Sequence, residues 1–255
     1  ALCHTFGTMA TGGFSTKQLS VGHYDSVYFD VVITVFMFLS GTNFALHYGA
    51  RRGDFRSYLR DSEFRFYGFI FLLCTALIVW DTMTTKVGDV VLYDSFGSAL
   101  RYASFQVSAI VTTTGYCTFN FQQWPGLSQF VLVVLMFFGG CAGSTAGGVK
   151  QIRFLLLLKQ GYVEIKRLIL PHVVLPVKVG DRVVSPEVMT NVLGFFFLFI
   201  GIFAIVTCMM AALGLDLVSA ASATIATLGN IGPGLSTVGP NDSYAHIPTL
   251  GKFIL

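Results

Sequence analysis

Four long apolar segments constrain the fold of this chain more than any other feature. A bilayer core about 30 Å thick is crossed by about 20 apolar residues in a helix that rises 1.5 Å per residue. The segments that approach this length are Val27 to Tyr48, Phe64 to Trp80, Phe130 to Leu158 and Met189 to Leu213, and a fifth begins near Ile247. We therefore predict an all-α membrane protein with several spans.

The shortage of charge supports this fold class. Only 11% of the 255 residues are charged, whereas a soluble domain carries about 25%. The five cysteines form no CxxC pair, the five histidines are scattered, and no nucleophile lies beside a base. We therefore predict neither a disulfide framework nor a zinc site, and we do not predict an enzyme.

Shorter apolar segments alternate with the spans. These segments are Ala1 to Ala10, Ser95 to Val111 and Leu215 to Ala226, and each runs into a cluster of Thr and Gly. Apolar stretches of this length are typical of re-entrant helices that cross only half of a membrane. The backbone groups at their ends are tolerated there only when they are buried in protein or line a watery cavity.

Basic residues predict the orientation of the spans, because cytoplasmic loops are enriched in Lys and Arg. Twelve of the sixteen lie in two regions, after the first span and around the end of the third: Arg51, Arg52, Arg56, Arg60, Arg65, Lys150, Arg153, Lys159, Lys166, Arg167, Lys178 and Arg182. The other four are Lys17, Lys86, Arg101 and Lys252. We expect the two basic regions to face the cytoplasm and the Thr/Gly clusters to open from the outer side.

The order of segments forms a repeat of span, short helix, Gly loop and span. The glycines that align are Gly13, Gly115 and Gly232, separated by 102 and 117 residues. Repeated units around a membrane path are a common way to build a pore or carrier.

The Thr/Gly clusters are typical of a cation filter. Potassium filters replace the water around the ion with successive backbone carbonyls, as in Thr-Val-Gly-Tyr-Gly. Thr114-Gly115-Tyr116 is close to that pattern, and Asn230-Ile231-Gly232 keeps its β-branched residue and its glycine. The preceding helix would direct its partly negative C-terminal end at the path. One such cluster is typical of an ordinary turn, but three at similar spacing favour a path for monovalent cations.

A Gly-rich stretch interrupts the third span. It runs Gly139-Gly140-Cys141-Ala142-Gly143-Ser144-Thr145-Ala146-Gly147-Gly148-Val149-Lys150. It lacks the Gly-Lys-Ser/Thr ending of a phosphate loop. Because Gly139, Gly143 and Gly147 are spaced by four, one alternative is close packing of small residues between helices. The other, which we favour, is an unwound segment that lies under the filter and gates it.

Few charges lie in or beside the spans. Asp30 begins the first span and Asp81 closes the second, and we expect both at the membrane interface. Arg153 either faces the space below the Gly-rich stretch or anchors the cytoplasmic side, and we favour the anchor.

The motifs resemble the bacterial Trk/Ktr/HKT potassium transporter superfamily, and within it the TrkH group. The resemblance covers essentially the whole chain and is carried by Cys3-His4-Thr5 through Gly12-Gly13-Phe14-Ser15-Thr16, Phe105-Gln106-Val107-Ser108 into Thr114-Gly115-Tyr116, Gly139-Gly140-Cys141-Ala142-Gly143-Ser144-Thr145, and Thr227-Leu228-Gly229-Asn230-Ile231-Gly232-Pro233-Gly234. The Gly-Gly-Cys-Ala-Gly-Ser-Thr stretch is the most specific of these.

The resemblance implies repeated span–pore helix–span units around a pseudo-fourfold axis. It implies potassium bound at filter positions Thr11, Gly12, Gly13, Thr113, Thr114, Gly115, Asn230, Ile231 and Gly232. It implies a gate loop containing Gly139, Gly140, Gly143, Ser144, Thr145, Gly147 and Gly148. It also implies potassium uptake across the bacterial inner membrane, a homodimer, and cytoplasmic TrkA-like nucleotide-binding regulatory subunits, with no organic cofactor on this chain.

Against that pattern, the chain is expected to be an internal piece that lacks the first repeat and the last span. We divide it into a second-repeat pore loop and inner span (1–50), a basic cytoplasmic loop (51–65), a third repeat with a broken inner span (66–162), a cytoplasmic segment (163–187), and the outer span and pore loop of a fourth repeat (188–255). Two other functions stay open. One is a sodium-coupled secondary transporter with broken helices, and the other is a helical anchoring subunit whose glycines only pack helices.

Overall fold

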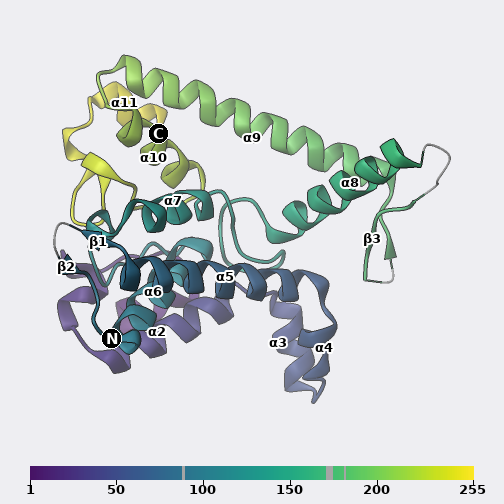
Figure 1. Cartoon of the computed structure of the whole chain (residues 1–255), viewed down its shortest axis with the longest axis horizontal. Coiled ribbons are helices and arrows are strands. Elements are labelled where there is room, and N and C mark those ends of the chain that lie inside the picture. The colour runs from purple at the N-terminus through teal and green to yellow at the C-terminus, as the bar shows by residue number, and fades with distance from the viewer. Residues whose placement is uncertain (88–89, 171–174, 181) are drawn as a thin grey trace.

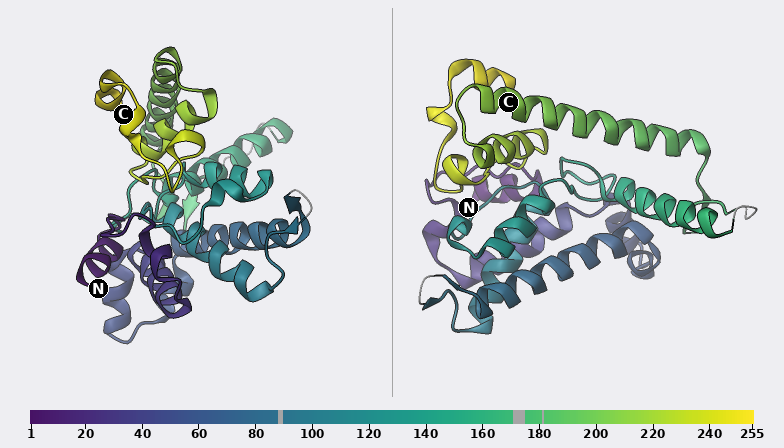
Figure 2. Two further views of the ribbon diagram at one scale, coloured as in Figure 1. Left: turned by 90° about the vertical axis from the view of Figure 1, so that its left-hand side faces the viewer. Right: turned by 45° about the horizontal axis from the view of Figure 1, so that its top comes forward.

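The computed structural model describes residues 1–87, 90–170, 175–180 and 182–255. Residues 171–174 and 181 of the predicted cytoplasmic segment lie outside this description. The described chain is mostly helical. Helix α9 runs along its long axis, and α8 extends toward the same end of the molecule with the opposite chain direction (Figures 1 and 2). The predicted all-α class is confirmed.

The helices vary in length from single turns to full spans. They are α1 (Leu2–Met9), α2 (Val27–Ser40), α3 (Phe44–Arg51), α4 (Arg56–Arg60), α5 (Ser62–Thr84), α6 (Phe96–Val111), α7 (Gly126–Leu135), α8 (Gln151–Ile169), α9 (Pro186–Ala212), α10 (Leu217–Leu228) and α11 (Thr249–Ile254). Two small antiparallel hairpins join β1 (Lys86–Val87) to β2 (Val90–Val91) and β3 (Lys178–Val179) to β4 (Arg182–Val183).

Polar side chains cap three of the helices that build the membrane core. Asp61 accepts a hydrogen bond from the Phe64 amide before α5, and Ser185 accepts one from Val188 before α9, where Pro186 opens the helix. Asp216 caps α10 in the same way. These side chains satisfy amides that have no partner within the helix. Hydrogen bonds from Ser219 hold the pKa of the Asp216 carboxyl below its usual range.

Two of the predicted spans are continuous helices. Among the described residues, α5 and α9 are long and apolar enough to cross a membrane. A third span exists if α2 and α3 are counted together, but these two helices meet at an angle of 100°. The predicted span from Val27 to Tyr48 is therefore not one continuous helix but a bent pair. The helix stops at Ser40, and the Asn43 side chain caps a new helix by accepting from the Ala45 amide.

The interruption of the third span is confirmed. Helix α7 ends at Leu135 and α8 begins at Gln151, so residues 136–150 belong to neither helix. Gly139, Gly143 and Gly147 therefore cannot form a small-residue stripe on a helix face, and that alternative is wrong. We call residues 137–150 the Gly-rich loop.

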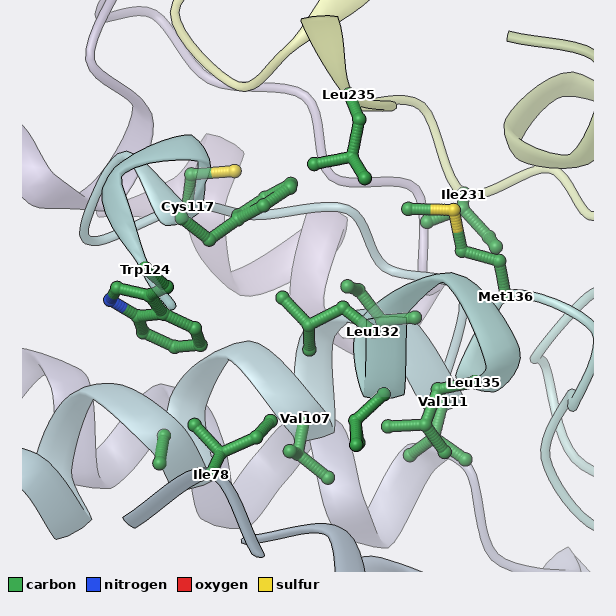
Figure 3. Packing of buried hydrophobic residues seen from close by; sticks show 14 of the residues in the cluster. Ile78, Val107, Val111, Cys117, Trp124, Leu132, Leu135, Met136, Ile231 and Leu235 are labelled. Carbon is green, nitrogen blue, oxygen red and sulfur yellow. The ribbon is translucent and has the colours of Figure 1, made fainter. Parts of the chain in front are cut away.

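The three half-length segments form helices close to their predicted bounds. They are α1, α6 and α10, and each is followed by a Thr/Gly cluster. The main hydrophobic core lies around α6, where α5 and α7 pack against it. Figure 3 shows Ile78 of α5, Val107 of α6 and Leu132 of α7 converging there. Helix α10 packs on α9, and α2 packs on the opposite side of α6 from the chain's C-terminal part.

Asp30 and Asp81 are buried, with relative exposures of 2% and 3%. Asp30 accepts from Arg101 Nε at 2.7 Å, and Arg101 also contacts the exposed Asp25 at 3.1 Å. Asp81 accepts from the Ser128 amide at 2.8 Å and from its hydroxyl at 2.6 Å, so it caps the start of α7. Both carboxylates therefore join helices, and neither is a solvated surface charge. Their depth in a bilayer stays a prediction.

The Arg101–Asp30 pair gives a test of this packing. Replacement Arg101→Gln leaves the Asp30 carboxylate buried without its cation, which we expect to cost about 3 kcal/mol of folding free energy. The measurement is the midpoint of thermal unfolding in detergent, with Lys17→Gln at an exposed position as the control. Adding Asp30→Asn to Arg101→Gln should recover part of the loss. Equal midpoints for Arg101→Gln and the control would contradict the assignment.

Candidate ion path and gate loop

The three Thr/Gly clusters share one backbone arrangement. In each, two successive amides bond to the carbonyl that lies six residues before the aligned glycine. Gly12 and Gly13 donate to Gly7 O, Thr114 and Gly115 donate to Ala109 O, and Ile231 and Gly232 donate to Ala226 O. We call these segments filter loops 1, 2 and 3, covering residues 11–13, 113–115 and 230–232. Their common hydrogen bonds show that they are copies of one structural unit.

The sign of φ alternates through each filter loop. The first residues, Thr11, Thr113 and Asn230, have φ of 50°, 56° and 57°, and the aligned glycines have φ of 64°, 78° and 107°. The middle residue of each loop is absent from the positive-φ set. The three loops therefore share the same left-handed positions at their first and last residues. We call the backbone carbonyls of each loop its carbonyl row.

The carbonyl rows have no internal partners. Among the described residues, no donor reaches the carbonyls of Thr11, Gly12, Thr113, Thr114, Asn230 or Ile231. The carbonyl of Gly232 accepts from the Tyr244 hydroxyl at 2.7 Å, and the carbonyl of Gly115 accepts a weak contact from Cys117 Sγ at 3.9 Å. Unpaired carbonyls at membrane depth are tolerated where they line a path for water or ions.

Neighbouring filter loops approach too closely for a side chain. A Cβ on Gly13 would lie 1.8 Å from Thr114 O, and a Cβ on Gly115 would lie 1.9 Å from Ile231 O. Loop 1 therefore abuts loop 2, and loop 2 abuts loop 3, through equivalent atoms. Around Gly232 nothing lies within 4 Å of the corresponding position among the described residues.

The side chains of the filter loops are anchored away from the carbonyl rows. Ile231 is 3% exposed and packs in the main core, where Figure 3 shows it beside Met136. Tyr116, which follows loop 2, is fully buried and donates to His4 O and Phe14 O, so it links loop 2 to α1 and to the end of loop 1. The backbone of each loop is thus held in place while its carbonyls stay free.

The Gly-rich loop contacts all three filter loops at their first residues. The Thr11 hydroxyl donates to Thr145 O at 2.9 Å, and the Gly147 amide donates to Thr113 Oγ1 at 2.6 Å. A Cβ on Gly147 would lie 2.9 Å from Gly229 O and 3.2 Å from Asn230 Cβ. The loop therefore lies against the first residue of each filter loop.

The ends of the Gly-rich loop are pinned together. Gly139 donates to Val149 O at 2.8 Å, and Phe138 pairs with Val149 in a parallel bridge. Gly148 sits against Gly139, with a φ of 63°. We call the paired ends of the loop, residues 138–139 and 147–149, its neck. We call the residues between them, 140–146, its tip. Every residue predicted for the gate lies in the neck or the tip.

Comparison with known proteins decides the family. The family model described as TrkH, cation transport protein, matches residues 1–255.

The chain belongs to the TrkH family.

Relatives and a solved structure agree with this assignment. The chain is 39% identical over 260 residues to the "Trk system potassium uptake protein TrkH" of Salmonella typhimurium, and 34% identical over 256 residues to the TrkG protein of Escherichia coli. All of this chain is covered in both cases. The crystal structure of the potassium transporter TrkH from Vibrio parahaemolyticus matches 99% of it with a TM-score of 0.87 and 37% identity. The chain spans about half the length of these relatives, 52% of the first and 53% of the crystal structure.

The structure of this TrkH-family chain adds residues that sequence reasoning missed. Glu63, at the start of α5, is 6% exposed and accepts from the Ala142 amide at 2.7 Å and from the Ile152 amide at 2.9 Å. Gln151 is fully buried and donates to Gly139 O at 2.8 Å. The signal available for Glu63 was an acidic residue at the first turn of an apolar span, beside a basic loop.

Arg153 belongs to α8, and its side chain reaches α9. Its guanidinium stacks on the Phe195 ring at 3.7 Å from the centroid. Such stacking stabilises a cation against an apolar helix. Whether Arg153 is a cytoplasmic anchor or lies below the Gly-rich loop stays a prediction.

The neck of the Gly-rich loop in this TrkH-family chain is testable by a single methyl group. Gly139→Ala would place Cβ 2.2 Å from Gly147 O, so we expect overpacking that costs about 1–3 kcal/mol. Gly161→Ala on α8 meets nothing within 4 Å and should be neutral or stabilising by up to about 1 kcal/mol. The thermal unfolding midpoint of Gly139→Ala should fall below that of the parent, while that of Gly161→Ala should equal or exceed it. Equal midpoints for the two variants would contradict the tight neck.

Proposed function

We propose that this chain forms most of a potassium-selective path of a bacterial uptake protein. The observation that carries the proposal is the common form of the filter loops, whose carbonyls are unpaired while their glycines abut the next loop. Relatives named as Trk system potassium uptake proteins support potassium as the ion. The pore helices α1, α6 and α10 end at these loops, so their partly negative C-termini favour a cation there.

The proposed filter positions are those predicted from sequence. They are Thr11, Gly12, Gly13, Thr113, Thr114, Gly115, Asn230, Ile231 and Gly232. Because the Gly232 carbonyl is already bonded to the Tyr244 hydroxyl, its contribution would be weaker than that of Gly13, and weaker than that of Gly115, whose carbonyl accepts only the weak thiol contact from Cys117. A further filter loop, from a repeat outside this sequence, would complete the ring beside Gly232.

The Gly-rich loop is proposed as the gate. Its contacts with Thr11, Thr113 and the Gly229–Asn230 turn support a closed position across the path. Its tip carries no bulky side chain, and Gly143 has a φ of 73°. Cys141 of the tip is fully buried in the main core, but its side chain is small, so the loop can change shape with little repacking.

We infer the wider assembly from the family to which the chain belongs. We propose a homodimer in the bacterial inner membrane, regulated by TrkA-like nucleotide-binding subunits at the cytoplasmic side. The division proposed is second-repeat loop and inner span (1–50), basic loop (51–65), third repeat (66–162), cytoplasmic segment (163–187) and fourth-repeat span and loop (188–255). The exposed arginines of α3 and α4, Arg51, Arg52, Arg56 and Arg60, would face that side.

A sodium-coupled transporter with broken helices is the second candidate. It is favoured by one observation, the two interrupted helices at Ser40–Phe44 and Leu135–Gln151. It does not require three equivalent carbonyl loops. Rubidium uptake that saturates without an organic solute supports the pore, whereas strict dependence on such a solute would support the carrier.

Replacement of Gly115 tests the filter. Gly115→Ser adds a Cβ that would meet Ile231 O at 1.9 Å, at a φ of 78° that disfavours side chains. We expect the ratio of potassium to sodium permeability in the full-length protein to fall at least several-fold. Gly201→Ala, which has open space on α9, is the matched control. An unchanged permeability ratio would remove Gly115 from the filter.

Bulky residues in the loop tip test the gate. Gly143→Leu and Ser144→Leu should alter the rate of rubidium flux in the full-length protein, because they enlarge a tip that fits beneath the filter. The ratio of potassium to sodium permeability should stay at the parent value, since no filter carbonyl moves. A changed ratio with an unchanged flux would contradict the gate and assign the tip to the filter.

A further inference from the structure

Glu63 is a buried carboxylate that the filter and gate described above do not require. It lies in the first turn of α5, and its Oε1 accepts from the Ala142 amide of the loop tip and the Ile152 amide of the first turn of α8. The residue is only 6% exposed. One side-chain atom thus joins three pieces of the molecule: a continuous span, the Gly-rich loop and the helix that follows it.

The position is costly without these partners. A buried carboxylate loses its hydration, and the loss is offset only when strong donors replace the water. Two backbone amides provide such donors, and the Ile152 amide belongs to the N-terminal turn of the 19-residue helix α8, where a negative charge is favoured. The carboxylate therefore loses one of its two amide donors when the tip leaves α5.

The broken helix α2 holds the same loop from the other side. Because α2 stops at Ser40, the carbonyls of Ser40 and Gly41 are free of helical partners, and they accept from the Thr145 and Cys141 amides at 3.4 and 2.8 Å. The Phe44 amide at the start of α3 donates in return to Gly143 O at 3.1 Å. These bonds are made by the backbone. Glu63 differs from them in gripping the tip with a side chain, so a substitution can remove its hold alone.

We propose that Glu63 is a positioning residue that latches the Gly-rich loop in its closed position against the break in α2. This inference rests on the proposed function, in which that loop is the gate. When the loop moves away from the filter, the Ala142 amide leaves Glu63, and the carboxylate keeps only α8 as its partner. The latch therefore favours the closed state without touching the ion.

The experiment compares Glu63→Ala and Glu63→Gln in the full-length protein in liposomes. Glu187→Gln is the matched control, because Glu187 also lies in the first turn of a span, α9, and is exposed. All variants carry Ser144→Cys in a background in which the exposed Cys3 and Cys208 are replaced by Ser. The readouts are the rate at which a charged methanethiosulfonate modifies Cys at position 144, rubidium flux, the potassium to sodium ratio, and the unfolding midpoint.

For Glu63→Ala we expect modification and flux to rise at least five-fold, with the permeability ratio unchanged. Glu63→Gln keeps an oxygen acceptor but loses the charge, so its effect should be smaller and in the same direction. Glu187→Gln should match the parent. If Glu63→Ala does not fold, Glu63→Gln still decides the question.

Two results would overturn the latch. One is a modification rate that stays at the parent value in a folded Glu63 variant. The other is a fall in flux and unfolding midpoint with no rise in modification, which would assign Glu63 to stability alone. Failure of the gate itself is recognised separately: the Leu variants at Gly143 and Ser144 would then leave flux unchanged, while Glu63→Ala would still raise modification of the loop.

Discussion

The need to satisfy backbone polar groups where water is scarce organises this structure. Each half-length helix ends inside the molecule, and its last turn would leave amides and carbonyls without partners. A single carbonyl, that of Gly7, Ala109 or Ala226, accepts the two amides that follow the turn. The amides are thereby consumed, and the carbonyls beyond them remain. The filter loops are therefore left with free acceptors rather than free donors, as the proposed cation path requires.

The same constraint explains why the Gly-rich loop lies where it does. The helix that ends at Ser40 exposes carbonyls that must find donors. The span that is interrupted between Leu135 and Gln151 exposes amides that must find acceptors. The two interruptions meet and exchange hydrogen bonds through Gly41, Cys141 and Gly143. Each break makes the other tolerable at membrane depth. If this loop is the proposed gate, it is held by many weak hydrogen bonds, so a modest free energy would move it.

The sequence predicted the elements whose signals are long and repeated. The bounds of α6 and of α9 lie within a few residues of the predicted segments, because apolar length and Thr/Gly termination act over many residues. The break after Ser40 was missed because Gly41-Thr42-Asn43 interrupts an apolar run with small residues that a membrane helix tolerates. Its cause is tertiary: Asn43 caps a new helix, and Gly41 is needed by a loop a hundred residues away.

The site residues also divide into those that the sequence could predict and those that depend on tertiary contacts. The three aligned glycines were predictable from sequence because left-handed backbone favours a residue that reaches positive φ without strain, and their role as filter positions stays a prediction. Glu63 was not predictable, because its role depends on which distant amides face it. Its neighbour Asp61 carries the same charge and serves only as a helix cap. Local sequence cannot separate two such carboxylates, since the difference lies in what α5 packs against.

The contacts of the aligned glycines also limit how many loops can complete the proposed ring. Gly13 abuts loop 2 and Gly115 abuts loop 3 through equivalent atoms, so the loops follow one another with the same sense. A closed ring of three would bring Gly232 against loop 1 in the same manner. Among the described residues nothing lies within 4 Å of that position. The three loops therefore form an open arc. A ring in which every pair of neighbouring loops makes the same contact needs more than three loops around the axis. The proposed further filter loop would contact Gly232 as Thr114 contacts Gly13, and it would complete the ring of carbonyls that one ion requires.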